Sequence, residues 1–319
     1  MSLVVIDGLS FALPLFIIAV GGIYSERSGV TNLALEGLLG FGAFTGGLFV
    51  VLTSGIFPQG SQTPICLSFL FAAIGGGAYS LIHATLCVKF RANQVMSGIA
   101  VNILAVALTG FFTYQVNAGV FGSPSDKFMI GVSPRVTAPG ISDIPVLGAF
   151  FTNVYPFEIM ILAIAAFCWY VLYRTRYGIR LRACGDNPQA VDAAGISVAK
   201  ARFGAVAISG ALSGVGGMCF AYSITANFSP AIYLGAGYLA IAALIFGNWK
   251  MIPALGACLI FGFARSAAYQ VAKSLEISSN VSDLAMSLPY VLTLLLLAFF
   301  SKGNRAPRAL GEIYDKGKR

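Results

Sequence analysis

The stretch "GLLGFGAFTGGLFVVLTSGIFPQGSQTPICLSFLFAAIGGGAYSLI", residues 37–82, contains no charged side chain. A helix that spans a bilayer needs about 20 apolar residues, so this stretch can supply two spans. A second uncharged run, 203–249, has the same capacity. Both runs are continuously apolar, without the alternation of a membrane β-strand. The sequence therefore predicts a polytopic helical membrane protein.

The composition of the whole chain supports this class. Of its 319 residues 57% are hydrophobic and 10% are charged, whereas a soluble domain carries about 25% charged residues. We expect an all-α fold with about nine transmembrane helices, within a range of eight to ten, in a single transmembrane domain, 1–319. The expected spans are 9–24, 30–53, 64–88, 93–115, 154–173, 203–224, 233–247, 252–272 and 284–300.

The basic residues predict the orientation, because cytoplasmic loops of membrane proteins carry an excess of Lys and Arg. With nine spans, 16 of the 20 basic residues fall on the side of the C-terminal tail and three, Lys127, Arg135 and Lys273, fall on the other. Arg265 lies inside a span. We expect a cytoplasmic loop at 174–202, a basic cytoplasmic tail at 301–319 and an N-terminus outside. The net charge of +8 suits membrane lipid headgroups and gives no indication of nucleic acid.

Two segments resemble one another within the chain. "GVTNLALEGLLGFGAF" (29–44) begins the second span and "SPAIYLGAGYLAIAALIF" (229–246) begins the seventh. An offset of five spans inverts the topology, which is the plan of inverted-repeat transporters. Chance similarity between two apolar helices is the alternative.

The sequence lacks the motifs of an enzyme. It has no Gly-x-x-x-x-Gly-Lys-Ser/Thr loop for nucleotide phosphates and no Cys-x-x-Cys motif, and its single histidine is His83. A lone histidine in a span is more often a packed, hydrogen-bonded group than a ligand. We expect no catalytic residue, no metal and no cofactor bound by this chain.

Polar residues within the spans mark a candidate substrate path. Asn32 and Glu36 share a helix face, and a stripe of Gln94, Ser97, Asn102 and Thr109 follows one face of the fourth span. Phe228 and Tyr238, with Tyr233, are aromatic residues that could stack on a flat cargo. The alternatives are interhelical hydrogen bonding for the stripe and a structural brace of the turn 25–29 for Glu36.

A short helix is predicted inside the cytoplasmic loop. Asn187 can cap it, Pro188 suits its first position and Gly195 can close it. It is too short to cross a bilayer.

Several stretches together resemble the permease subunits of ABC importers, in the branched-chain amino acid/ribose group and its nucleoside-type branch. The resemblance covers nearly the whole chain, although 248–253 departs from the family's Arg-Trp-Asn-Pro pattern and Arg265 stands where a neutral or acidic residue is usual. The matching stretches are "ERSGVTNLALEGLLGFGAF" (26–44), "FRANQVMSGIAVN" (90–102), "SDIPVLG" (142–148), "YRTRYGIRLRACGDNPQAVDAAGISVAKAR" (173–202), "ALIFGNW" (243–249) and "LPYVLTLLLLAFF" (288–300).

The resemblance implies a bacterial inner-membrane permease that pairs with a second permease subunit, a cytoplasmic ABC ATPase holding ATP and magnesium, and a substrate-binding lipoprotein. It implies that the short helix couples this chain to the ATPase. The expected coupling residues are Asp186, Asn187, Pro188, Ala190, Ala193, Ala194 and Gly195. The expected small-molecule substrate is a nucleoside. A permease for a simple sugar such as ribose and an ion-coupled secondary transporter are the alternatives.

Overall fold

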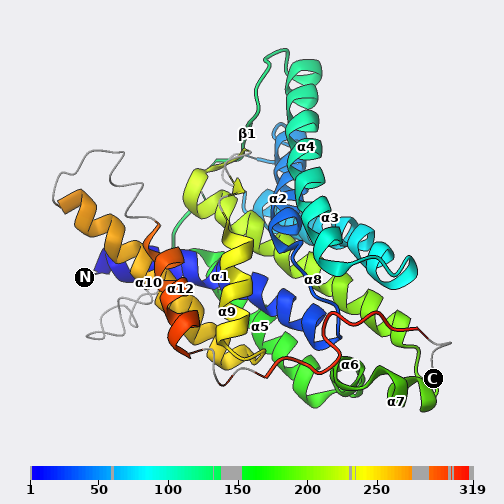
Figure 1. Ribbon diagram of the computed structural model, residues 1–319. Coiled ribbons are helices and arrows are strands. Elements are labelled where there is room, and N and C mark those ends of the chain that lie inside the picture. Colours follow the sequence, from blue (N-terminus) through cyan, green and yellow to red (C-terminus); the bar gives the residue numbers. More distant parts are fainter. Residues whose placement is uncertain are drawn as a thin grey trace.

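The computed structural model describes residues 2–58, 61–131, 133–137, 153–229, 232–233, 235–274, 287–300, 303 and 305–315. Helices dominate this part of the chain, and two short strands form one antiparallel pair (Figure 1). The helices are α1 (Ser2–Arg27), α2 (Leu35–Leu52), α3 (Thr63–Ala84), α4 (Gln94–Val120), α5 (Pro156–Arg174), α6 (Arg176–Asp186), α7 (Pro188–Ala193), α8 (Val198–Phe220), α9 (Ala236–Phe246), α10 (Met251–Ser274) and α12 (Leu288–Phe300). The π-helical turns are η1 (Thr85–Lys89) and η3 (Ala221–Thr225), and the strands are β1 (Phe128–Met129) and β2 (Asn227–Phe228).

Each of the nine predicted spans corresponds to an apolar helix, but two of these helices are short. Within the described residues, seven helices are long and apolar enough to cross a bilayer. The other two, α9 and α12, have 11 and 13 residues. They are about 16 Å and 20 Å long, less than the hydrocarbon core of about 30 Å. The predicted number of nine is therefore approximate.

The packing of the helices follows the inverted repeat. Helix α1 packs on α10 as α8 packs on α3, and α1 packs on α9 as α8 packs on α2. Helix α2 packs on α4 as α9 packs on α12. Exchanging α1, α2, α3 and α4 for α8, α9, α10 and α12 reproduces each pair, which is the offset of five spans that the sequence suggests.

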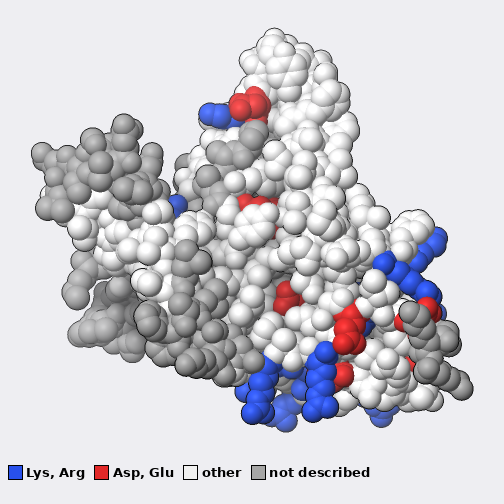
Figure 2. Space-filling view, in the orientation of Figure 1, with Lys and Arg blue, Asp and Glu red and all other residues white. Residues whose placement is uncertain are grey.

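The loops gather at two opposite ends of the bundle. One end carries η1, α6, α7 and residues 305–315, and Figure 2 shows Lys and Arg side chains gathered there. At the other end β1 pairs with β2, and Arg135 lies 3.9 Å from Asp7. We call these the basic end and the opposite end.

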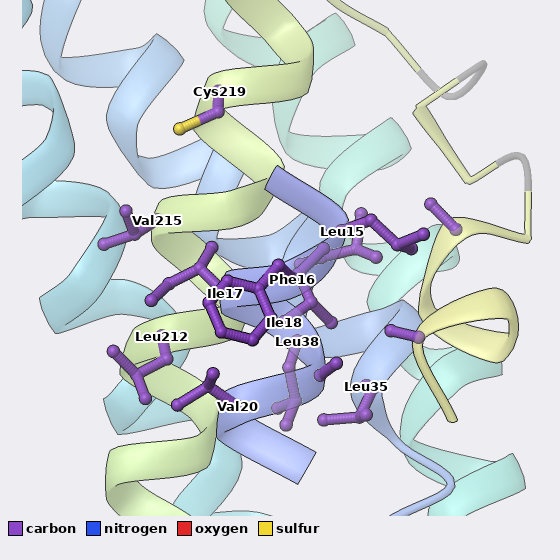
Figure 3. Packing of buried hydrophobic residues seen from close by; sticks show 14 of the residues in the cluster. Leu15, Phe16, Ile17, Ile18, Val20, Leu35, Leu38, Leu212, Val215 and Cys219 are labelled. Atoms are coloured by element: carbon purple, nitrogen blue, oxygen red, sulfur yellow. The ribbon is translucent and has the colours of Figure 1, made fainter. Parts of the chain in front are cut away.

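The core lies where α1, α2 and α8 meet (Figure 3). Leu15, Ile17 and Ile18 of α1 are fully buried, and Ile18 lies directly against Gly216 of α8. A Cβ on Gly42 of α2 would overlap the main chain of Gly214 on α8. Small residues thus permit the close approach on which membrane helices depend, because lipid supplies no hydrophobic force between them.

Candidate functional site

The N-termini of α2 and α9 meet at one carboxylate. Glu36, in the first turn of α2, accepts the backbone N–H of Gly235 at 2.7 Å and that of Gly237 at 2.5 Å. Its side chain satisfies two donors that the beginning of α9 would otherwise leave unpaired. The positive ends of both helix dipoles favour a negative charge here. Glu36 is 5% exposed, so this contact is internal to the bundle.

Asn102 joins α4 to the same junction. Its Oδ1 accepts the backbone N–H of Gly37 at 2.7 Å. Its Nδ2 donates to the carbonyl of Leu33 at 2.8 Å and to the hydroxyl of Tyr238 at 3.0 Å. One amide therefore contacts the beginning of α2, the segment before it and a side chain of α9.

The segment 28–34 between α1 and α2 is non-helical and internal. Asn32, fully buried, donates from Nδ2 to Ser209 Oγ at 2.9 Å. Ser209 lies seven residues after Arg202 on α8, which places Asn32 about 10 Å inside the bundle from the basic end. Irregular backbone at such depth occurs where protein buries it or where it lines a polar cavity.

Two further residues of the predicted stripe hold this segment. Gln94 Oε1 accepts the N–H of Thr31 at 2.7 Å. Ser97 Oγ lies 2.9 Å from His83 Nδ1, while His83 Nε2 lies 3.2 Å from the carbonyl of Thr31. Because a carbonyl only accepts, Nε2 carries the proton and Nδ1 accepts from the Ser97 hydroxyl. His83 is therefore a packed, hydrogen-bonded group, as expected.

We call Asn32, Glu36, Gln94, Ser97, Asn102 and Tyr238 the central polar cluster. The structure brings these six predicted path residues together and places His83 and Thr31, which the prediction did not include, beside them. Thr109, farther along the stripe, pairs with the hydroxyl of Tyr233 at 3.0 Å.

Phe228 lies apart from the cluster. It belongs to β2, is fully buried and packs against Phe44 and Phe128 at ring-centroid distances of 5.7 Å and 6.1 Å. The position of Phe228 in the strand pair at the opposite end makes it a core residue.

Glu36 does not brace the turn 25–29, the alternative that the sequence left open, because its carboxylate bonds to the beginning of α9. Other residues hold this turn. Ser25 Oγ donates to the carbonyl of Val30 at 2.9 Å, and Arg202 Nε donates to that of Ser28 at 3.2 Å.

The predicted short helix is present as α7, at the surface of the basic end. Asn187 Oδ1 accepts the N–H of Ala190 at 3.0 Å, Pro188 occupies the first turn and Gly195 has a φ of +78°. Pro188 is buried against the bundle. The remaining expected coupling residues are exposed: Asp186, Asn187, Ala190, Ala193, Ala194 and Gly195.

The loop before α7 is more helical than predicted. Helix α6 begins after Thr175, whose hydroxyl accepts the N–H of Gly178 at 3.3 Å. It buries Leu181 and Cys184 and exposes Arg176. An amphipathic pattern of this kind is typical of a surface helix, whereas the sequence predicts only a cytoplasmic loop here.

Residues 305–315 form an ordered strap across the basic end (Figure 1, red), and the sequence indicated only a basic tail. Ala309 donates its N–H to the carbonyl of Gly185 at 2.8 Å. Gly311 donates to the carbonyl of Gly29 at 3.1 Å. Asn248, in the stretch that departs from the family pattern, accepts the N–H of Arg305 at 2.8 Å. We call residues 305–315 the C-terminal strap.

No metal site is evident in the described part of the chain, where no three His, Cys, Asp or Glu side chains are placed to hold an ion.

Comparison with known proteins identifies the family. Residues 4–298 match the family described as branched-chain amino acid transport system / permease component. The chain belongs to this permease family. It is thus a multi-pass membrane subunit of an ABC transporter, a class that works with an ATPase and a binding protein.

Two relatives cover the whole of the chain, and a third covers most of it. The guanosine ABC transporter permease protein NupQ of Bacillus subtilis is 41% identical over 100% of this chain and 98% of its own length. The nucleoside ABC transporter permease protein NupC of Lactococcus lactis is 38% identical with the same coverage. The putative glucose permease protein TsgC13 of Haloferax volcanii is 31% identical over 79% of this chain and 72% of its own length. No solved structure matched the chain.

Proposed function

We propose that this permease carries nucleosides into the cell through a bacterial inner membrane, with the basic end in the cytoplasm and the N-terminus outside. The observation that carries the substrate class is the full-length similarity to a guanosine permease and a nucleoside permease. The glucose permease is less similar and aligns over a smaller share of the chain, so a sugar is the weaker alternative.

The partner ATPase would dock on α7. Ala190 and Ala193 are exposed on α7, and Ala194 and Gly195 are exposed directly after it. These small residues leave room for a close approach by another protein. The partner would hold ATP and magnesium, because this chain has no phosphate-binding loop.

The C-terminal strap connects α7 mechanically to the interior of the bundle. It bonds to Gly185 just before α7 and to Gly29 within the non-helical segment 28–34, which also contains Asn32. A displacement of α7 would thus be transmitted through main-chain hydrogen bonds to the beginning of α2. Separation of the α2 and α9 N-termini there would open the path.

The central polar cluster would line or gate the path rather than bind cargo tightly. Glu36 and Asn102 already bond to backbone groups, so cargo would meet them only as the helices separate. The binding lipoprotein would supply affinity, since a path must also release its cargo. A second permease subunit would complete the path.

Uptake measurements on the complete importer test this function. Cells should take up labelled guanosine, adenosine or uridine faster than ribose, and a Lys-to-Ala change in the phosphate-binding loop of the partner ATPase should abolish uptake. Faster uptake of ribose would favour the sugar alternative. Uptake that survives loss of the ATPase and stops with a proton uncoupler would identify an ion-coupled transporter.

A further inference from the structure

A cavity of about 340 Å³ lies beside α7 at the basic end. A second cavity, at the opposite end, is lined by charged and hydroxyl side chains that do not belong to the central polar cluster. The second has a volume of about 320 Å³ and lies between α1, η3 and α10. Small-molecule sites commonly begin at about 300 Å³. Its lining includes Asp7, Ser223, Arg265, Ser266 and Tyr269, and none of the central polar cluster.

With Arg135, Arg265 is one of the two cations that line this cavity. Its guanidinium lies 4.4 Å from the ring centroid of Phe11, a cation–π contact. Among the described residues, no carbonyl or carboxylate accepts a hydrogen bond from it. A guanidinium carries five N–H donors in a planar fork, and within a membrane helix these donors need acceptors. A ligand that carries two adjacent acceptors would satisfy them.

Two hydroxyl groups of the cavity are also without partners. Ser223 Oγ on η3 and Ser266 Oγ on α10 are buried, and the part of the chain that the structure describes gives neither a hydrogen bond. Buried polar groups are nearly always paired in native proteins. These two hydroxyls come from different elements and meet in one cavity, as in a site built for a polar ligand.

Asp7 adds an acceptor. Its Oδ2 accepts from Gln270 Nε2 at 3.2 Å, while its Oδ1 is 3.9 Å from Arg135, which is too far for a hydrogen bond. Oδ1 therefore retains capacity for a donor of the ligand.

The geometry points to a docking site for a 6-oxopurine nucleoside such as guanosine in the cavity of Asp7, Ser223, Arg265 and Ser266. This assignment rests on the proposed function and names its substrate class. Guanine presents O6 and N7 as adjacent acceptors, which the fork of an arginine pairs bidentately. Its N1–H and amino group can donate to Asp7, and the ribose hydroxyls can pair with the two serines. Adenine instead presents an amino donor beside N7, so one arm of Arg265 would face a donor.

Competition between nucleosides tests the assignment. In the complete importer, Arg265→Gln should lower uptake of guanosine relative to adenosine by about tenfold, because one bidentate pair discriminates between bases by about 5- to 150-fold. Lys273→Gln is the matched control, since Lys273 is an exposed cation on α10 outside the cavity. An unchanged ratio in Arg265→Gln would overturn the assignment, whereas a wild-type importer that takes up no nucleoside would overturn the proposed function.

Thiol protection tests the site in protein that retains Arg265. Cys66 is the exposed cysteine and the other five are buried, so a Cys66→Ser variant should react little with thiol reagents. In that background, Ile224→Cys, which replaces an exposed residue of the cavity lining, should react with a small methanethiosulfonate in the purified complex, and guanosine should slow the reaction more than adenosine does. Equal rates with guanosine, adenosine and no nucleoside would refute the site even if Arg265→Gln fails to assemble.

Discussion

Ala309 donates its backbone N–H to the carbonyl oxygen of Gly185 at 2.8 Å, which pins the C-terminal strap to the end of α6 directly before α7. Tyr314, farther along the strap, packs against the small cluster of Cys184, Val191 and Val198. The strap is thus a packed part of the basic end, close to the proposed ATPase contact.

Ending the chain after residue 304 should uncouple ATP hydrolysis from transport. The truncation removes the hydrogen bonds to Gly185 and Gly29 and uncovers Cys184, which is fully buried and whose thiol pKa burial raises. We expect the complex to retain basal ATP turnover, lose stimulation by cargo and gain maleimide labelling at Cys184. Truncation after residue 315 is the control, because it keeps the strap. Normal cargo stimulation in the shorter protein would show that the strap plays no part in coupling.

Arg202 should be the residue that holds the strap down. It is 4% exposed and donates to the carbonyls of Ser28 at 3.2 Å and Glu312 at 3.0 Å. Hydrogen bonds to a charged group contribute about 1.5–3 kcal/mol each, so Arg202→Met should release the strap and lower the unfolding temperature of the complex. Limited trypsin digestion should then cleave faster after Arg305 and Arg308. Lys200→Met, which removes an exposed cation two residues away, should digest like the wild type, and equal rates for both variants would contradict the assignment.

Glu36→Gln should slow uptake while it leaves assembly and basal ATP turnover intact. The amide can accept from only one of Gly235 and Gly237, and a buried N–H left unpaired costs about 1–3 kcal/mol. The junction of α2 and α9 would loosen without loss of the surrounding core. Asn102→Leu, which removes the bonds to Gly37 and Leu33, should act in the same direction. Full uptake by the double variant would make both residues structural braces outside the path.

The sequence was sufficient for features that depend on local pattern. Continuous hydropathy located the nine apolar helices, and the 3.6-residue period placed Gln94, Ser97 and Asn102 on one buried face of α4. Asn187, Pro188 and Gly195 marked α7 because capping depends on a few neighbouring residues. These predictions required no knowledge of distant partners.

Long-range partners could not be predicted in the same way. Glu36 lies 199 residues from Gly235, and nothing near Glu36 indicates that it caps another helix. The burial of Phe228 could not be predicted from its neighbours, because it depends on pairing with Phe128, which lies in a distant loop with no strong sequence pattern. The sequence predicts only a basic tail at 301–319, because the strap is held largely by backbone hydrogen bonds, which composition does not reveal.

Ala194→Trp should weaken the contact with the ATPase. Ala194 is exposed immediately after α7, and a large side chain in a close-packed interface costs about 1–3 kcal/mol. The purified complex should lose ATPase chains or transport-coupled hydrolysis. Gly55→Trp adds the same bulk to an open position at the opposite end and should leave both unchanged. Normal transport and ATP turnover in Ala194→Trp would make α7 a simple connector.

The orientation in the membrane can be tested with single cysteines at the two ends, on the Cys66→Ser background. Gly55→Cys lies in the exposed turn after α2 at the opposite end, and Ala194→Cys lies at the basic end. Because basic loops remain in the cytoplasm, a membrane-impermeant maleimide should label Gly55→Cys in intact cells and Ala194→Cys only after the membrane is opened. Labelling of Ala194→Cys in intact cells, with Gly55→Cys protected, would invert the topology and move the proposed ATPase contact to the wrong side of the membrane.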